Sequence, residues 1–420
     1  MIEQKNKVLR ISTAGSVDDG KSTLIGRMLY DTNSLKADKL EAMRRSSEQK
    51  GSDTLDFSLA TDGLVAEREQ GITIDVAHIY FSTANRSYII ADTPGHIEYT
   101  RNMVTGTSTS DVSIILIDAR NGVIEQTKRH FFINSLLRTR KIIVAINKMD
   151  LVDYNEERFT NIVQDFNKLV AHSSYKEQAI IFIPISAKFG DNITEKSSNF
   201  PWYKGETLMQ VLENIQIDET EDHAAARFQI QTVIRPQTDE FHDYRGYAGK
   251  LKGGEMSVGD EVVVLPSGTN SKIKSIDFYD KHYQTASRGS SITLTLEDDI
   301  NVSRGDLIVK VNELPQEAKE LKAIICWMDK EPLISAGNYL LQHGVKIVKS
   351  KIASIDSKLD ETFTSQETNV NELKLNDLGL VTIKLAQSLN FDAYIDNKEN
   401  GSFILIDTRS NTTAGVGFIQ

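Results

Sequence analysis

Gly15-Ser16-Val17-Asp18-Asp19-Gly20-Lys21-Ser22 is the stretch of sequence that decides the fold. It matches the complete phosphate-binding loop pattern Gly-x-x-x-x-Gly-Lys-Ser/Thr. Residues 8–13 predict a buried strand before it, and residues 22–30 predict an amphipathic helix after it. Main-chain N–H groups in such a loop surround phosphate oxygens, and the helix start adds partial positive charge. The loop therefore predicts a nucleoside triphosphate site, with Lys21 on the β- and γ-phosphates and the Ser22 hydroxyl on Mg²⁺.

The composition restricts the class of protein. A chain of 420 residues is too long for one hydrophobic core, so we expect two or three domains. The net charge of −11 argues against a primary role in binding nucleic acid. Cys326 is the single cysteine, which excludes an internal disulfide and a cysteine-based zinc site. The sequence shows no signal-peptide core and no apolar run near the roughly 20 residues that span a bilayer, so we expect a cytoplasmic protein without a membrane partner.

The first half alternates between two patterns. Near-continuous apolar runs predict strands, and the segments between them have helical periodicity, which together predict a mostly parallel sheet covered by helices. The predicted strands are 8–13, 88–91, 112–117, 141–146 and 180–185. The predicted helices are 38–49, 98–105, 125–137, 156–170 and 207–215.

The second half reads as β structure. A polar acidic segment at 219–223 marks a linker, and short apolar runs separated by Gly- and Pro-containing turns follow it. Strands are predicted at 228–234, 261–265, 271–277, 291–296, 323–328, 346–355, 380–385, 392–396 and 402–407, with a loop at 356–372. The predicted fold class is an α/β phosphate-loop domain at 1–220, followed by two all-β barrel domains at 221–315 and 316–420.

Two further motifs bear on the phosphates. Asp92-Thr93-Pro94-Gly95-His96 follows a predicted strand, where its carboxylate can hold Mg²⁺ and Gly95 lets the main chain approach a γ-phosphate. Gly71-Ile72-Thr73-Ile74 precedes that strand, and Thr73 would close on Mg²⁺ when a γ-phosphate is present. Taken alone, the first could be an ordinary Pro-Gly turn and the second an edge-strand threonine.

The remaining two motifs indicate guanine. In Asn147-Lys148-Met149-Asp150, the Asp150 carboxylate can accept hydrogen bonds from guanine N1–H and N2, a donor pair that adenine lacks. Asn147 would brace the loop, and the Lys148 stem can lie along the ring. Ser186-Ala187-Lys188 could offer a main-chain N–H to guanine O6. Each motif alone could be a polar turn, but all five occur in the right order at strand ends or in adjoining loops, which predicts a GTPase.

The chain resembles the translation-factor class of GTPases, which includes elongation factor Tu and elongation factor 1-alpha. Residues 67–75 and 92–96 carry this resemblance, together with the order of one G domain and two β-barrels. Within the class it resembles the GTPase subunits, subunit 1, of heterodimeric sulfate adenylyltransferase. That resemblance is carried by residues 12–27, 29–31, 91–103, 235–236 and 244–249. Elongation factors usually have His where this loop has Ser16, which favours the second family.

The resemblance implies a coupled reaction. A separate small catalytic subunit would bind ATP and sulfate and form adenylyl sulfate and pyrophosphate, and GTP hydrolysis on this chain would drive that uphill step. His96 would position the attacking water, with Lys21 and Thr73 as the other catalytic residues and Ser22, Thr73 and Asp92 as Mg²⁺ ligands. The residues assigned to GTP are Gly15, Ser16, Val17, Asp18, Asp19, Gly20, Lys21, Ser22, Thr23, Asp92, Thr93, Pro94, Gly95, His96, Asn147, Lys148, Met149, Asp150, Ser186, Ala187 and Lys188.

Three expectations remain to be weighed. Some relatives carry a fused adenylylsulfate kinase domain with its own phosphate loop, but residues 246–250 have the wrong spacing for one, so we expect no kinase domain. Two carboxylates beside a triphosphate are unfavourable, so at least one of Asp18 and Asp19 should point outward. The alternative functions are an elongation-factor-like GTPase that binds aminoacyl-tRNA, and a scaffold that binds GTP with negligible hydrolysis.

Overall fold

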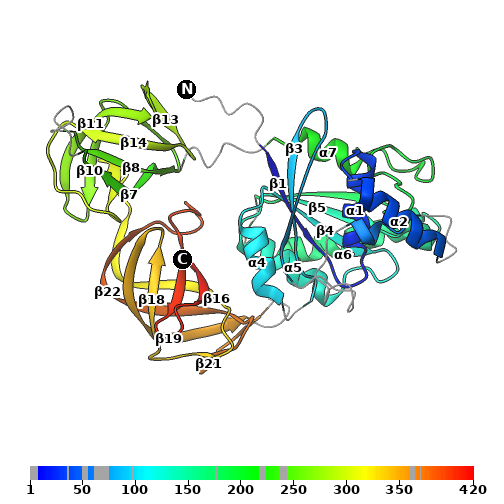
Figure 1. Cartoon of the computed structure of the whole chain (residues 1–420). Coiled ribbons are helices and arrows are strands. Elements are labelled where there is room, and N and C mark those ends of the chain that lie inside the picture. The colour runs from blue at the N-terminus through cyan, green and yellow to red at the C-terminus, as the bar shows by residue number, and fades with distance from the viewer. Residues whose placement is uncertain are drawn as a thin grey trace. The chain divides into compact units, whose positions relative to one another are not determined.

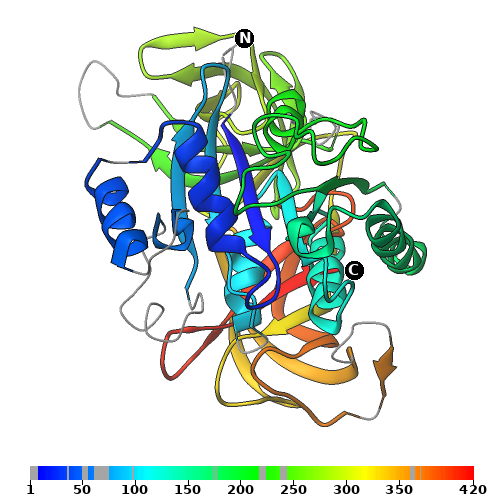
Figure 2. The same ribbon diagram turned by 90° about the vertical axis from the view of Figure 1, so that its right-hand side faces the viewer.

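A computed structural model describes residues 8–35, 37–49, 55–60, 75–96, 99–173, 175, 177–216, 224–236, 244–359, 365–368 and 370–420 (Figure 1, Figure 2). The chain forms two compact units. One contains the phosphate loop, and the other contains the β-rich second half. None of the helices in the described part of the chain is long and apolar enough to cross a membrane.

The first unit is built on a six-stranded sheet in the order β2-β3-β1-β4-β5-β6. All neighbouring strands are parallel except β2, which is antiparallel to β3. The strands are β1 Leu9–Ala14, β2 Ala77–Ser82, β3 Ser87–Asp92, β4 Val112–Asp118, β5 Lys141–Asn147 and β6 Ala179–Pro184. Every residue of β4 is buried, as expected for a strand with both faces covered.

Helices cover both faces of this sheet (Figure 1). They are α1 Lys21–Asp31, α2 Ala37–Gln49, α4 Thr100–Ser108, α5 Glu125–Leu136, α6 Glu156–His172 and α7 Leu208–Asn214, with short 3-10 turns η1 Phe57–Ala60 and η3 Met149–Val152. Ile183 of β6 shares an apolar core with α1 and α7. Phe182, the residue before Ile183, faces the opposite side of the sheet because side chains alternate along a strand. There Phe182 packs edge-on against Phe166 of α6, which also packs against Phe131 of α5.

The second unit contains two closed antiparallel β-barrels. In the first barrel six strands close in the order β10-β15-β7-β8-β14-β11, and β12 extends the sheet beside β11. In the second barrel the closed order is β18-β23-β24-β16-β22-β19, and β20 extends it. A mostly parallel α/β domain followed by two six-stranded barrels confirms the predicted fold class.

The strand bounds of the second unit are as follows. The first barrel and its accessory hairpin contain β7 Arg227–Ile234, β8 Gly246–Lys252, β9 Glu255–Ser257, β10 Glu261–Leu265, β11 Thr269–Phe278, β12 Lys281–Tyr283, β13 Thr285–Ser287, β14 Ser291–Leu296 and β15 Leu307–Lys310. The second contains β16 Gln316–Trp327, β17 Leu333–Ile334, β18 Asn338–His343, β19 Lys346–Leu359, β20 Gln366–Glu367, β21 Glu372–Leu373, β22 Leu378–Phe391, β23 Ser402–Asp407 and β24 Thr413–Ile419.

Two sequence predictions in this half are wrong. The alternating residues 392–396 predict a strand, but the Ala393 carbonyl accepts hydrogen bonds from the N–H groups of Asp396 and Asn397, which makes a turn. The polar segment 356–372 predicts a loop, but β19 continues to Leu359 and two short strands, β20 and β21, begin within it. In both cases polar side chains take part in local pairing. The sequence pattern of the turn therefore resembles that of a strand, and the pattern of the strands resembles that of a loop.

A buried ion pair joins the two barrels. Arg227 of β7 is 2 % exposed, and its Nε and Nη2 donate to the two carboxylate oxygens of Asp392 at 2.9 and 2.8 Å. Its Nη1 donates to the carbonyls of Ala226 and Glu313 at 3.0 and 2.7 Å. Asn400 adds a third hydrogen bond to Asp392, at 2.7 Å. The guanidinium and the carboxylate are therefore both well satisfied in a dry environment.

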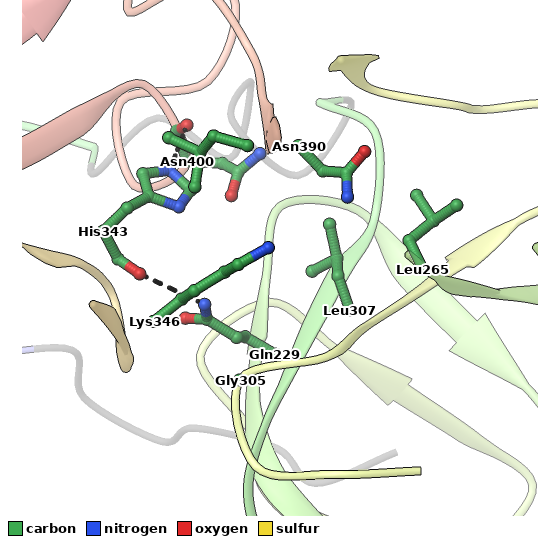
Figure 3. Close-up of a pocket in the computed structure, with 9 residues that line it drawn as sticks. Gln229, Leu265, Gly305, Leu307, His343, Lys346, Asn390 and Asn400 are labelled. Atoms are coloured by element: carbon green, nitrogen blue, oxygen red, sulfur yellow. Dashed lines mark hydrogen bonds between the residues drawn. The ribbon is translucent and has the colours of Figure 1, made fainter. Parts of the chain in front are cut away.

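A second buried contact lies at the same junction (Figure 3). The Gln229 amide of β7 donates to the His343 carbonyl at 3.2 Å and accepts from the N–H of Val345 at 3.1 Å. The His343 ring is 3 % exposed, and its Nε2 lies 2.8 Å from the Asn400 carbonyl, so Nε2–H is the donor. Burial lowers the pKa of His343 to about 4, although the hydrogen bond to Asn400 opposes the shift.

Replacing Arg227 by Ala should destabilise the barrel unit strongly. The change leaves the Asp392 carboxylate at the junction without its cation, which typically costs about 3–5 kcal/mol. Chemical denaturation, followed by a spectroscopic signal of the barrel unit, measures the decrease in the free energy of unfolding. Lys272→Ala is the matched control, because it breaks an exposed 3.4 Å pair with Glu261 in the same unit and should cost less than about 1 kcal/mol. Equal effects of the two variants would contradict this account.

Acid should weaken the unit through His343. The folded pKa of about 4 lies below the ordinary histidine pKa of 6.5, so the unfolded state binds more protons. The contribution to stability is therefore complete above about pH 6.5 and is lost as the pH falls toward about 4. Between pH 7.5 and 5 we expect His343→Gln to lose about 2 kcal/mol less than the wild type in urea denaturation. His78 is exposed and lies in the first unit, so the control variant His78→Gln should keep the wild-type pH dependence of the barrel unit. A His343→Gln variant that also kept it would refute the role of His343.

Candidate functional site

The phosphate loop occupies the carboxyl edge of the parallel sheet, where open α/β sheets bind ligands. It joins the end of β1 to Lys21 at the start of α1, and Figure 2 shows it as the dark blue turn between them. Gly20 has φ +95°, and a Cβ there would lie 2.5 Å from Asn147 Nδ2. Only glycine satisfies both the dihedral angle and the close approach.

The Lys21 ammonium is held inside this loop. The side chain is buried, and its Nζ donates to the carbonyls of Gly15 at 2.8 Å and Ser16 at 3.4 Å. Burial lowers the pKa of Lys21, and the nearby carboxylates of Asp92 and Asp19 oppose that shift. A phosphate oxygen is a stronger acceptor for an ammonium than a main-chain carbonyl, so this cation is well placed to change partners.

The segment after β3 meets the loop at Lys21. Asp92 is buried and accepts a hydrogen bond from the Thr13 hydroxyl at 3.0 Å, and the Thr93 hydroxyl donates to the Thr13 carbonyl at 2.5 Å. A Cβ at Gly95 would overlap the Gly15 carbonyl and come within 2.7 Å of Lys21 Nζ. The main chain at Gly95 therefore lies directly against the phosphate loop and its cation.

The side-chain oxygens at this point are suitable ligands for Mg²⁺. Ser22 stands in the first turn of α1, and Asp92 lies close enough to Lys21 to act on its pKa. A hydroxyl and a carboxylate are the hard ligands that Mg²⁺ takes beside substrate phosphates. Thr73, the third predicted ligand, lies outside the described residues.

Two residues of α5 reach the same place, and the sequence analysis missed them. Gln126 Nε2 donates to the Gly95 carbonyl at 2.7 Å and lies 3.2 Å from His130 Nε2. Burial, followed by the positive charges of Lys21 and Arg129, lowers the pKa of His130 to about 3, so its neutral ring can accept the second N–H of Gln126. The two residues are one helical turn apart in a segment of mixed polar and apolar residues, so no motif marks them.

Asn147 connects the phosphate loop to the two guanine motifs. Its Nδ2 donates to the Asp19 carbonyl at 2.8 Å, and its Oδ1 accepts from the N–H of Ala187 at 2.9 Å. The Ser186 hydroxyl donates to Asp150 Oδ1 at 2.6 Å. The structure thus brings together three predicted motifs that are far apart in the sequence.

Lys148 is anchored beside this loop by a residue that the sequence analysis did not select. Its Nζ lies 3.0 Å from Asp118 Oδ2 at the end of β4 and also donates to the Asp18 carbonyl. Burial would raise the pKa of Asp118, but hydrogen bonds from Arg120 and Lys148 lower it to about 2. A carboxylate directly after a predicted strand was the available signal.

The other predicted residues vary in exposure. Val17 and Asp18 are exposed, whereas Asp19 is buried, so the expectation that one carboxylate points outward holds for Asp18. His96 is exposed, and its ring centroid lies 6.2 Å from that of Tyr99. The remaining positions divide into buried Thr93, Pro94, Met149, Ser186 and Ala187, intermediate Thr23, and exposed Lys188.

Known proteins similar to this chain fit the same architecture. Residues 6–218 match the family model described as elongation factor Tu GTP binding domain, and residues 320–420 match GTP-eEF1A C-terminal domain-like. Sulfate adenylyltransferase subunit 1 of Colwellia psychrerythraea is 47% identical over 99% of this chain and 88% of its own length. The Bacteroides fragilis protein of that name is 47% identical over 99% of this chain and 86% of its own length.

A longer relative extends the comparison. The bifunctional enzyme CysN/CysC of Mycobacterium tuberculosis is 44% identical over 98% of this chain, which spans 67% of that protein. The similarity thus covers both the GTP-binding domain and the two barrels. The chain belongs to the sulfate adenylyltransferase subunit 1 family, within the GTP-binding proteins related to elongation factor Tu.

Proposed function

We propose that this chain is the GTP-hydrolysing subunit of a cytoplasmic sulfate adenylyltransferase. It couples GTP cleavage to the formation of adenylyl sulfate and pyrophosphate from ATP and sulfate on a separate, small catalytic subunit. The observation that carries the proposal is the joining of the phosphate loop to the guanine motifs through Asn147, in a chain 47% identical to subunit 1 proteins.

The phosphate side of the site holds and senses the γ-phosphate. Lys21 exchanges the Gly15 carbonyl for phosphate oxygens, and the N–H of Gly95 donates to the γ-phosphate. Gln126 holds the Gly95 carbonyl, which restrains the main chain immediately after that N–H. Ser22 and Asp92, with Thr73 as the third predicted ligand, would hold Mg²⁺, which would neutralise charge on the phosphates. His96 positions the attacking water.

The base side selects guanine. The Ser186 hydroxyl holds one oxygen of Asp150, which orients the carboxylate toward the N1–H and N2 donors of the base. The N–H of Ala187 is used by Asn147, so we assign the contact with guanine O6 to the next main-chain N–H, at Lys188. Adenine would leave the other Asp150 oxygen without a donor, which is a heavy penalty in a partly buried site.

Coupling requires two states of the chain that the catalytic subunit distinguishes. The γ-phosphate would engage the N–H of Gly95, and its loss would release that contact. Contacts that form in only one of these states can pull the uphill reaction forward.

GTP turnover by the chain with its catalytic subunit should rise on the order of tenfold or more when ATP and sulfate are both added, as for other GTPases completed by a partner. Phosphate release and adenylyl sulfate are measured together. Lys21→Ala should reduce turnover by about two orders of magnitude, because it removes the cation on the phosphates. Turnover that ignores ATP and sulfate but responds to ribosomes with aminoacyl-tRNA would identify a translation factor instead.

Asp150→Asn should weaken GTP binding by roughly 100-fold or more, since an amide cannot accept both guanine donors. The same variant should bind xanthosine triphosphate better than the wild type, because the Asn N–H can donate to the carbonyl at position 2 of xanthine. Asp153→Asn is the control: this nearby carboxylate is exposed, its φ of 53° suits Asn equally well, and affinity should not change. Unchanged GTP affinity in the Asp150 variant would remove this residue from the base site.

A further inference from the structure

The phosphate loop contains a buried carboxyl group that the proposed reaction does not use. Asp19 is 3 % exposed, and its Oδ2 accepts a hydrogen bond from the N–H of Ser16 at 2.5 Å. Its carbonyl accepts from Asn147 at 2.8 Å. The side chain therefore folds the loop back on itself, while the main chain ties the loop to the base site.

Burial has the largest effect on the pKa of this carboxyl group. Burial raises the pKa of Asp19 to about 6, the hydrogen bond from Ser16 opposes the shift, Lys21 lowers the pKa and Asp118 raises it. Near pH 7 the free protein thus holds a buried carboxylate that is mostly ionised but easily protonated. The cation that offsets it, Lys21, is the same group that the phosphates of GTP would engage.

We propose that Asp19 is a positioning residue that shapes the phosphate loop through Ser16 and takes up one proton from solvent when GTP binds. The inference rests on the proposed GTP site. A protonated carboxyl keeps an oxygen that can accept the Ser16 N–H, so the loop retains its shape. It no longer opposes the triphosphate, whose negative charge exceeds the positive charge of Lys21 and one Mg²⁺ together.

The consequence is a defined pH dependence. At pH values between the pKa of Asp19 in the free protein and its higher pKa in the complex, the binding of each GTP is accompanied by the uptake of one proton. The affinity should therefore fall by up to tenfold for each pH unit above about 6. Below about pH 6 the carboxyl group of the free protein already carries the proton, and this contribution disappears.

The experiment measures the affinity for the slowly hydrolysed analogue GTPγS with Mg²⁺ from pH 5.5 to 8.5, by calorimetry on the full chain. Asp19→Asn keeps an acceptor oxygen for Ser16 and removes the titratable group. Asp18→Asn removes the same charge from the exposed neighbour in the same loop. The nucleotide's own titration is common to all three proteins and cancels in their differences.

The wild type and Asp18→Asn should lose affinity as the pH rises above about 6, and Asp19→Asn should lose at least threefold less per pH unit. At pH 7.5 the wild-type heat should also depend on the ionisation enthalpy of the buffer, which reports proton uptake without any variant. Wild-type binding without proton uptake, or equal pH dependence in both Asp variants, would overturn the role of Asp19. Either result would leave the proposed GTP site in place. Absence of GTPγS binding by the wild type would overturn the proposed function as well.

Discussion

The side-chain amide of Asn147 is the interaction on which the rest of the site depends. One amide has a donor and an acceptor at a fixed angle, and here the donor holds the Asp19 carbonyl while the acceptor holds the Ala187 N–H. The phosphate loop, the Asp150 segment and the Ser186 segment are thereby fixed to one another. Gly20 completes the constraint, because a side chain at that position would collide with the same amide. A carboxylate at position 147 would have no N–H for Asp19.

The site divides into a rigid part and a part that can rearrange. The base side is fixed by Asn147, by the Ser186–Asp150 hydrogen bond and by the pair between Lys148 and Asp118. On the phosphate side, the Lys21 ammonium donates to the Gly15 carbonyl, an acceptor that a nucleotide can replace. The Gly95 carbonyl accepts from Gln126, a contact from which a nucleotide can pull it away. Under the proposed function, recognition of the base therefore stays constant while the γ-phosphate changes the contacts of the other half.

Much of the fold follows from local patterns. The runs at 112–117 and 141–146 are apolar apart from Ser113 and Lys141, so they predict buried parallel strands, and the structure confirms both as β4 and β5. The family assignment is likewise confirmed. The strand β2 was not predicted, because exposed polar and aromatic residues interrupt its pattern at an edge of the sheet. The domain limits at 220 and 315 remain predictions.

The candidate site was only partly predictable. Its motifs combine a glycine-rich loop with strand ends, and such local features are visible in a sequence. Gln126, His130 and Asp118 act through contacts that exist only after α5 and β4 have packed beside the loop. Likewise, the sequence places Asp18 and Asp19 side by side, but burial, which separates their chemistry, is a property of the fold.

The ion pair between Arg227 and Asp392 has a mechanical consequence. It is buried and satisfied on both sides, and Gln229 adds a second point of attachment, so the two barrels cannot rotate against each other without breaking several hydrogen bonds. The two barrels therefore move as one body for as long as these hydrogen bonds hold.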